Sequence, residues 1–250
     1  MSTRNKILIA TVLIFFVCVV VWAIRTTPTE PPPIEKFEPP TIIEYEGNTI
    51  TEEQDGKLLW ELTCDKMRID TITQNVDIDG VKGKFYQYEG EDVKIWELTA
   101  ATGSYDQVKK NILVKGDVVV TNSKGEQLLS DELEWIAEQE LASASGNVNV
   151  TNSEGAQLLS DKLEWFAKQE LVSASGNVKI LNDDGAKLKG DKVEWFTAEE
   201  KVIATGDVRV SKDDMRGFGD LAYADNGFKH FGLLGNAKVL KGVKDMEEAF

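Results

Sequence analysis

The chain has little that could build a catalytic centre. It contains one histidine, His230, so clusters of histidines and triads that need a second histidine are excluded. No CxxC, HExxH, Walker A, GxGxxG or GxSxG motif occurs. Carboxylates are plentiful, as in Asp131-Glu132 and Asp183-Asp184, but they recur at predicted turns and outward positions. We therefore predict a protein that is not an enzyme and that carries neither a metal nor a cofactor.

Cysteine and proline are also scarce, and their positions are informative. Of the two cysteines, Cys18 lies in an apolar segment, so Cys64 has no partner for an intrachain disulfide. All six prolines lie between Pro28 and Pro40, a composition typical of a stiff, extended spacer. From residue 41 onward there is no proline, so every backbone N–H is available to a β-ladder.

One long apolar run is present, from Ile7 to Ile24, and it is uncharged. A helix of this length spans roughly 27 Å, enough to cross the hydrocarbon core of a bilayer. Arg4 and Lys6 precede the run, which predicts a cytoplasmic N-terminus and an exported remainder. The alternative is a cleaved signal peptide, but the run exceeds a usual h-region and no A-x-A site follows.

These boundaries predict four parts. Residues 1–25 would form a cytoplasmic tip and transmembrane anchor, 26–40 a proline-rich spacer, 41–240 an exported β domain and 241–250 a polar tail. Beyond residue 25 the chain has 25 basic against 43 acidic side chains, a formal charge of −18. This net charge argues against nucleic acid and anionic headgroups as electrostatic partners.

A repeat of 30 residues occupies most of the exported part. Gly116, Gly146, Gly176 and Gly206 are equally spaced and open related phrases, GDVVV, GNVNV, GNVKI and GDVRV, and a fifth phrase, GNAKV, follows at 235. A fixed period of this size indicates stacked or hairpin-built units. Around each glycine, apolar and polar residues alternate, as expected of half-buried strands, and TNSEG, TNSKG or LNDDG supplies a turn.

The second strand of each unit has a recurrent spacing. With a leucine at position i, a small residue follows at i+2, an apolar residue at i+5 and a large residue at i+7. It reads Leu128-Ser130-Leu133-Trp135, Leu158-Ser160-Leu163-Trp165 and Leu188-Gly190-Val193-Trp195, and upstream Leu62-Cys64-Met67-Ile69 and Leu98-Ala100-Gly103-Tyr105. The step of three predicts a β-bulge or corner that recurs in register.

These patterns predict an all-β protein: one continuous antiparallel sheet of roughly a dozen strands or more, curled by its bulges into a jelly-roll or open barrel. Two interpretations of the tryptophans remain open, a plain hydrophobic core or the lining of a groove. Asp131, Asp161 and Asp191 hold equivalent places, which favours Asx-type bonds at the bulge over metal binding.

With these features in place, the sequence resembles LptC, the membrane-anchored bridge component of lipopolysaccharide export, and its later repeats resemble the LptA/OstA-like group. The resemblance rests on Gly56-x3-Trp60-x-Leu62, on WELTA at 96–100 followed by Tyr105-Asp106, and on ILVKGDVVV leading into GEQLLSDELEW. It covers residues 7 to about 240. The chain departs from the family in having more repeats than an ordinary LptC.

The resemblance implies a twisted β jelly-roll behind a single N-terminal transmembrane helix in the inner membrane, with an apolar groove that shelters acyl chains of lipopolysaccharide. Gly56 matches a glycine in the first strand turn. The positions expected to line the groove, from the family pattern and its repeats, are Trp60, Leu62, Met67, Ile69, Leu98, Tyr105, Val118, Val120, Leu133, Trp135, Val148 and Val150.

The resemblance also implies partners: an ABC transporter like LptBFG that delivers the lipid, and a periplasmic LptA-like protein that receives it at the C-terminal edge strand. A second hypothesis stays open, that of a scaffolding β-repeat protein in the same location, whose tryptophans serve only as core.

Overall fold

The computed structural model describes residues 42–89, 92–225 and 230–242. These residues form a single antiparallel sheet of 16 strands, numbered in chain order. The strands are β1 Ile42–Glu46, β2 Thr49–Gln54, β3 Lys57–Thr63, β4 Lys66–Asp70, β5 Asn75–Glu89, β6 Asp92–Asp106, β7 Asn111–Asn122, β8 Gln127–Ile136, β9 Leu141–Thr151, β10 Gln157–Phe166, β11 Leu171–Leu181, β12 Lys187–Phe196, β13 Lys201–Lys212, β14 Met215–Asp225, β15 His230–Leu234 and β16 Lys238–Lys241. Two short 3-10 turns, Ala137–Gln139 and Ala167–Gln169, follow β8 and β10.

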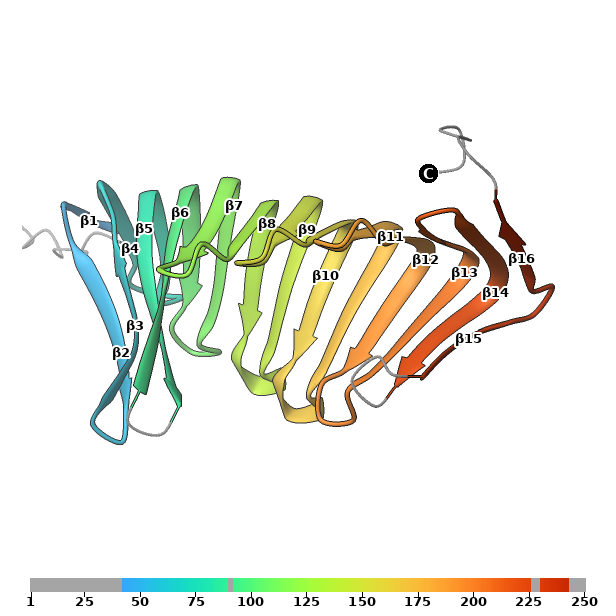
Figure 1. Cartoon of the computed structure of the whole chain (residues 1–250). Coiled ribbons are helices and arrows are strands. Elements are labelled where there is room, and N and C mark those ends of the chain that lie inside the picture. Colours follow the sequence, from blue (N-terminus) through green and yellow to red (C-terminus); the bar gives the residue numbers. More distant parts are fainter. Residues whose placement is uncertain (1–41, 90–91, 226–229, 243–250) are drawn as a thin grey trace, which may run out of the picture. The chain divides into compact units, whose positions relative to one another are not determined.

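From β5 to β14 each strand pairs with the strands before and after it in sequence, so the sheet grows by successive hairpins (Figure 1). At both ends, two short strands share one long neighbour. β3 and β4 pair with different halves of β5, and β15 and β16 pair with different halves of β14. Each end of the sheet is thus divided between two short strands. The division continues as a line that crosses all the long strands and separates the sheet into two halves, or leaves.

The repeated glycines form that line. At Gly146-Asn147 both residues have positive φ, and three residues of β9 lie opposite two of β8, which is a β-bulge. The Asn147 side chain donates a hydrogen bond of 2.9 Å to Asp131 Oδ2, and Asn177 makes the same bond to Asp161. A Cβ at Gly146 would lie 2.3 Å from that Asp131 oxygen, so only glycine fits.

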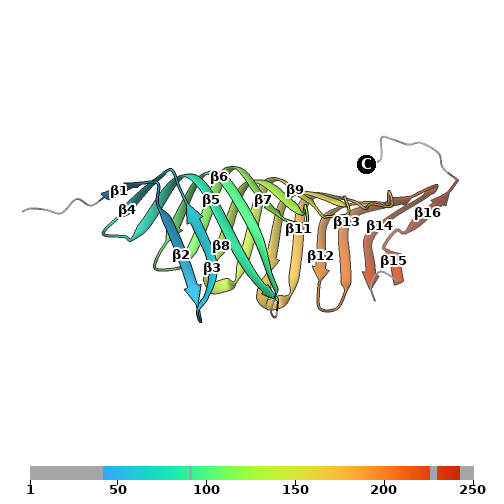
Figure 2. The ribbon, with the colours of Figure 1, turned by 60° about the vertical axis from the view of Figure 1, so that its left-hand side comes forward.

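The bulge line folds the sheet back on itself. Trp60 of β3 is aligned across the strands with Trp96 of β6 through Phe85, and Tyr105 lies nine positions after Trp96 along β6. A flat strand would place those positions about 30 Å apart. Yet the rings of Trp60 and Tyr105 lie 5.3 Å apart, in an edge-to-face contact. The two leaves therefore face each other, and Figure 2 shows the bend from a second direction.

We call the half of the sheet that contains β1, β4, β15 and Tyr105 leaf A, and the half that contains β2, β3, β16 and Trp60 leaf B. Their facing sides carry the apolar residues. One core cluster, from β3 to β7, includes Leu62, Met67 and Leu98, and a second, from β11 to β14, includes Val178 and Val208. Along the bulge line a buried valine of one strand lies opposite a small residue of the next, as in Val148 opposite Ser160 and Val178 opposite Gly190.

The predicted all-β, antiparallel architecture with recurrent bulges is confirmed. Asp131 and Asp161 accept hydrogen bonds at the bulge, but the donor is the side chain of an asparagine 16 residues on and not a backbone N–H, as an Asx-type bond would have. The predicted anchor and spacer, residues 1–40, and most of the polar tail lie outside the described residues. Within the described ranges, no helix has the length and apolar character needed to cross a membrane.

Candidate lipid-binding face

A continuous row of apolar residues crosses leaf A close to its free margin. We call it the rim row. The pairing register joins one residue of each strand to the next, and no charged residue interrupts the series. Its members from β5 to β15 are Val76, Tyr105, Ile112, Trp135, Ala142, Trp165, Val172, Trp195, Val202, Ala224 and Phe231.

At its N-terminal end the rim row is covered by leaf B. Tyr105 is 3% exposed and packs against Trp60, and its hydroxyl donates a 3.4 Å hydrogen bond to Glu52 of β2. Lys110 approaches the same Glu52 oxygen at 3.2 Å. Burial raises the pKa of the Tyr105 phenol, and the Tyr105 hydroxyl and Glu52 raise the pKa of Lys110. The margins of the two leaves are thus held together over β2 to β6.

Towards the C-terminal end the same row becomes accessible. Trp165 is 46% exposed, Trp195 45% and Phe231 81%. Leu158, Leu163, Ile180 and Leu188, deeper between the leaves, are only partly buried. Large apolar side chains on the surface of a soluble domain mark an interaction site when they form a continuous patch. The inner face is therefore closed at one end and presents indole rings at the other.

The structure brings the twelve predicted lining residues onto the inner side of the two leaves. Seven of them are buried: Trp60, Leu62, Met67, Leu98, Tyr105, Val118 and Val148. The other five, Ile69, Val120, Leu133, Trp135 and Val150, are partly buried. Gly56, with φ +75, follows Asp55 in the two-residue turn between β2 and β3. Most of the predicted set thus lies at the closed end.

Sequence reasoning missed parts of this face. Trp165 and Trp195 were recognised in the repeat spacing but not included with Trp135, although the period of 30 residues carries the row on to them. Val76, Ile78 and Val81 of β5, each at most 2% exposed, were also missed because β5 lacks the repeat phrase. Gly47-Asn48 connects β1 to β2, with Gly47 at φ +62, and its GN dipeptide was the available signal.

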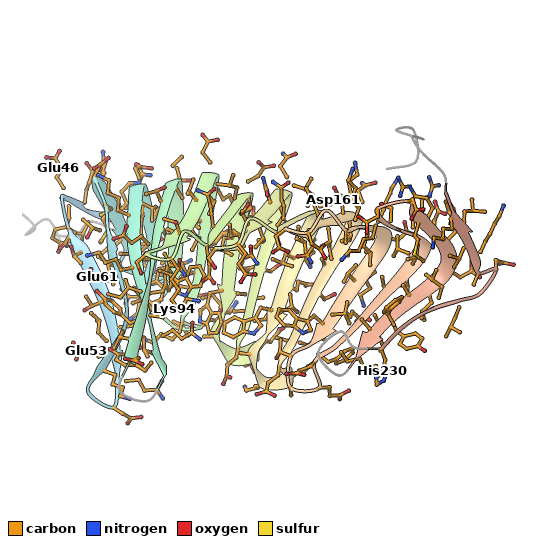
Figure 3. The ribbon with its side chains drawn as sticks, viewed as in Figure 1. Glu46, Glu53, Glu61, Lys94, Asp161 and His230 are labelled. Carbon is orange, nitrogen blue, oxygen red and sulfur yellow. The ribbon has the colours of Figure 1, made fainter. Side chains whose placement is uncertain are left out.

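Polar side chains gather where β6 begins and β7 ends. A hollow of about 590 Å³, where β6 begins and β7 ends, is lined by residues that include Lys94 and Asn122. Lys94 forms a 2.7 Å ion pair with Glu126. Lys94 and Asn122 lower the pKa of Glu126 by hydrogen bonding. In Figure 3, His230 lies at the opposite end of the sheet from Glu46, Glu53 and Glu61. The described residues contain no group of three or more His, Cys, Asp or Glu side chains that could hold a metal ion.

These features define a class: a folded, bulged antiparallel sheet built from repeats, with an apolar interior between two leaves. The model of the family described as "Lipopolysaccharide-assembly, LptC-related" matches residues 8–202. Because the match covers most of the chain, the protein belongs to this LptC-related family. Membership connects it with lipopolysaccharide transport, in which this family is a non-enzymatic component.

The chain can also be compared with curated proteins and with solved structures. Among curated proteins, none matches the chain. A solved structure that resembles it is LptH of Pseudomonas aeruginosa, "the LptA homologous periplasmic component of the conserved lipopolysaccharide transport device". The sequences are 14% identical, the TM-score is 0.42, and the match covers 47% of this chain and 94% of LptH.

Proposed function

We propose that the protein carries lipopolysaccharide from the inner membrane across the periplasm, with the acyl chains held between the two leaves. The single observation that carries this proposal is the rim row, which presents Trp165 and Trp195 half-exposed on an otherwise apolar inner face. Burial of apolar surface contributes about 25 cal/mol per Å². Acyl chains against these residues would therefore be retained without any charged contact.

The exposed indoles also suit a position at the boundary between the acyl chains and the headgroup of such a lipid. Tryptophan combines a large apolar ring with one N–H donor and favours positions where one end is dry and the other wet. In this proposal the chains lie against the interior rows, and the headgroup lies outside the rim. The twelve predicted lining residues form the wall and floor, with the buried members shaping the interior.

The proposal includes the anchor and the delivery step expected from the sequence. Residues 7–24 would hold the chain in the inner membrane with the domain in the periplasm, and an ABC transporter like LptBFG would supply the lipid. Family membership supports this assignment. It also favours transport over a purely scaffolding role, for which the exposed row has no use.

We further propose that an LptA-like protein continues the sheet at β15 and β16. The rim row ends at Phe231, and the row of leaf B that includes Ile180 and Leu188 ends at Val239, which is 59% exposed. Unpaired strand edges are templates for strand addition. An added strand would cover both side chains and extend the apolar interior.

We expect Phe231→Asp combined with Val239→Asp to weaken capture of an LptA-like protein at least tenfold, because two carboxylates would face the added strand. Stability should change little, since both side chains are exposed. Val108→Asp is the matched control, because Val108 is 72% exposed in the turn after β6, far along the sheet. Equal capture by the double variant and the control would contradict the docking proposal.

The transport proposal itself is tested by mass spectrometry of lipid that co-purifies with the full chain in mild detergent. We expect lipopolysaccharide or its lipid A part at a fixed ratio to protein. Purification without any bound lipid from cells that make lipopolysaccharide would favour the scaffolding alternative.

A further inference from the structure

The outer side of leaf B carries an unusual distribution of charge near the C-terminal end. In β11, β12 and β13 the inward residues Ile180, Leu188 and Val210 belong to or pack against the second core cluster. Their neighbours along each strand point to the opposite side. The register places these outward residues in two adjacent rows that run from β11 to β16.

We call these two rows the basic face. One row consists of Lys179, Lys189, Arg209, Phe218 and Lys238, and the other of Leu181, Lys187, Ser211, Arg216 and Leu240. Six of these ten residues are cationic and none is acidic, in a chain with 28 basic and 43 acidic side chains. The remaining four include three large apolar residues. The whole-chain charge of −15 therefore conceals a local surface of the opposite sign.

The arrangement is costly to the fold. Lys179 is the direct cross-strand partner of Lys189, and Lys189 that of Arg209, and like charges in such positions destabilise a sheet. Several lysines elsewhere are neutralised by carboxylates, as in the 2.6 Å pairs of Lys162 with Glu164 and Lys192 with Glu194. No ion pair between described residues involves Lys179, Lys189 or Lys238.

Among the described residues, the acidic ones near the basic face lie at its margins, in the turns and at the bulge. Arg209 binds Asp207 at 2.8 Å, and Lys212 binds Asp184. Asp183 and Asp213 lie near Lys212, whose pKa is raised by these carboxylates, Asp184 first among them. The carboxylates at these margins are therefore partly neutralised by the cations beside them. The two rows between the margins keep a net positive charge.

From this geometry we propose that the basic face is a docking surface for a bilayer that contains anionic lipids. Lysine and arginine side chains side by side on a sheet can meet several headgroup phosphates at once. Leu181, which is 39% exposed, and Phe218 and Leu240, which are partly buried, add apolar side chains among the cations, as on surfaces that adsorb at a membrane interface. This surface is separate from the inner face between the leaves and does not depend on what the inner face holds.

The test uses the full chain in phosphatidylcholine nanodiscs, captured through a tag at its N-terminus, with vesicles passed over it. We expect vesicles that contain phosphatidylglycerol to be tethered at low salt, and pure phosphatidylcholine vesicles not to be. Each surface lysine removed should weaken tethering about fivefold, so Lys179→Gln, Lys189→Gln and Lys238→Gln together should weaken it about 100-fold. Tethering should also be lost near 1 M salt, where the Debye length is about 3 Å.

A triple variant with the same charge change on leaf A, Lys66→Gln, Lys115→Gln and Lys162→Gln, is the matched control. These lysines are paired with carboxylates, so the variant should retain tethering within a few-fold. The basic-face variant should be no less stable than the parent, because it relieves repulsion. Equal tethering of both vesicle types, no tethering of either, or equal losses in the two triple variants would each overturn the proposal.

Discussion

Trp60→Ala is expected to reduce the free energy of unfolding by about 3–5 kcal/mol, a large part of the stability of an ordinary domain. Trp60 is 8% exposed, belongs to the first core cluster and forms the edge-to-face contact with Tyr105 that joins the two leaves. Its removal leaves a cavity and also removes the main apolar contact across the margins. Urea unfolding followed by the circular dichroism of the sheet measures the effect.

The matched control is Trp165→Ala, the same change at the exposed end of the face. Because Trp165 is 46% exposed, we expect its loss to reduce the free energy of unfolding by about 1 kcal/mol or less. Equal destabilisation by the two variants would mean that the tryptophans are equivalent core residues. The distinction between a closed and an open end of the inner face would then be wrong.

The second large effect concerns lipid. We expect Trp165→Ala combined with Trp195→Ala to reduce the amount of co-purified lipid at least tenfold, with the sheet intact. An indole buries about 150–250 Å², and roughly half of it is available here, which corresponds to about 2–3 kcal/mol for each ring placed against acyl chains. The ratio of lipid to protein, measured by mass spectrometry, checks this expectation.

Phe196→Ala is a suitable control for this double variant. Phe196 is the residue after Trp195, so it points to the opposite side of leaf A and is aligned with Leu171 and Lys201. We expect the Phe196→Ala variant to carry as much lipid as the parent protein. Unchanged lipid in the Trp165 and Trp195 double variant would show that the exposed rings do not contact the cargo.

Much of this fold follows from the sequence. The 30-residue period, the absence of proline after residue 40 and the alternation around each glycine predict a long antiparallel sheet. The step of three residues at Ser130, Ser160 and Gly190 predicts the bulge. These signals are reliable because each describes a local constraint: a glycine at positive φ, or a small residue opposite a buried valine.

The remainder depends on long-range pairing. Glu52 and Lys110 are 58 residues apart, and no periodicity announces that they meet across the margins of the leaves. The basic face was hidden for a related reason. Lys179, Lys189 and Arg209 are dispersed among acidic residues in the sequence, and only the register aligns them. The net charge alone predicts a surface that repels anionic headgroups everywhere. Because cationic residues are aligned on the basic face, that prediction does not apply to every part of the surface.

The sequence also could not predict how far the two leaves close over the rim row at each end of the sheet. The repeat gives Trp135, Trp165 and Trp195 equivalent positions, yet Trp135 packs against the first core cluster and the other two are half-exposed. The difference arises because β2 and β3 cover the rim row only at its N-terminal end. Residues near the ends of a repeat array have different neighbours from those in the middle, and the sequence pattern does not record this.

The central claim is that the acyl chains of lipopolysaccharide lie against the inner face and not against the outer one. Leu158 and Leu159 of β10 test it most directly, because they are adjacent and of one type but point to opposite sides of leaf B, Leu158 against the second core cluster and Leu159 outward at 37% exposure. A photoreactive benzoylphenylalanine is placed at each position in turn, and cells are irradiated. We predict a cross-link to lipopolysaccharide from position 158 and none from position 159. Cross-links of equal yield from both positions, or from position 159 alone, would contradict the account.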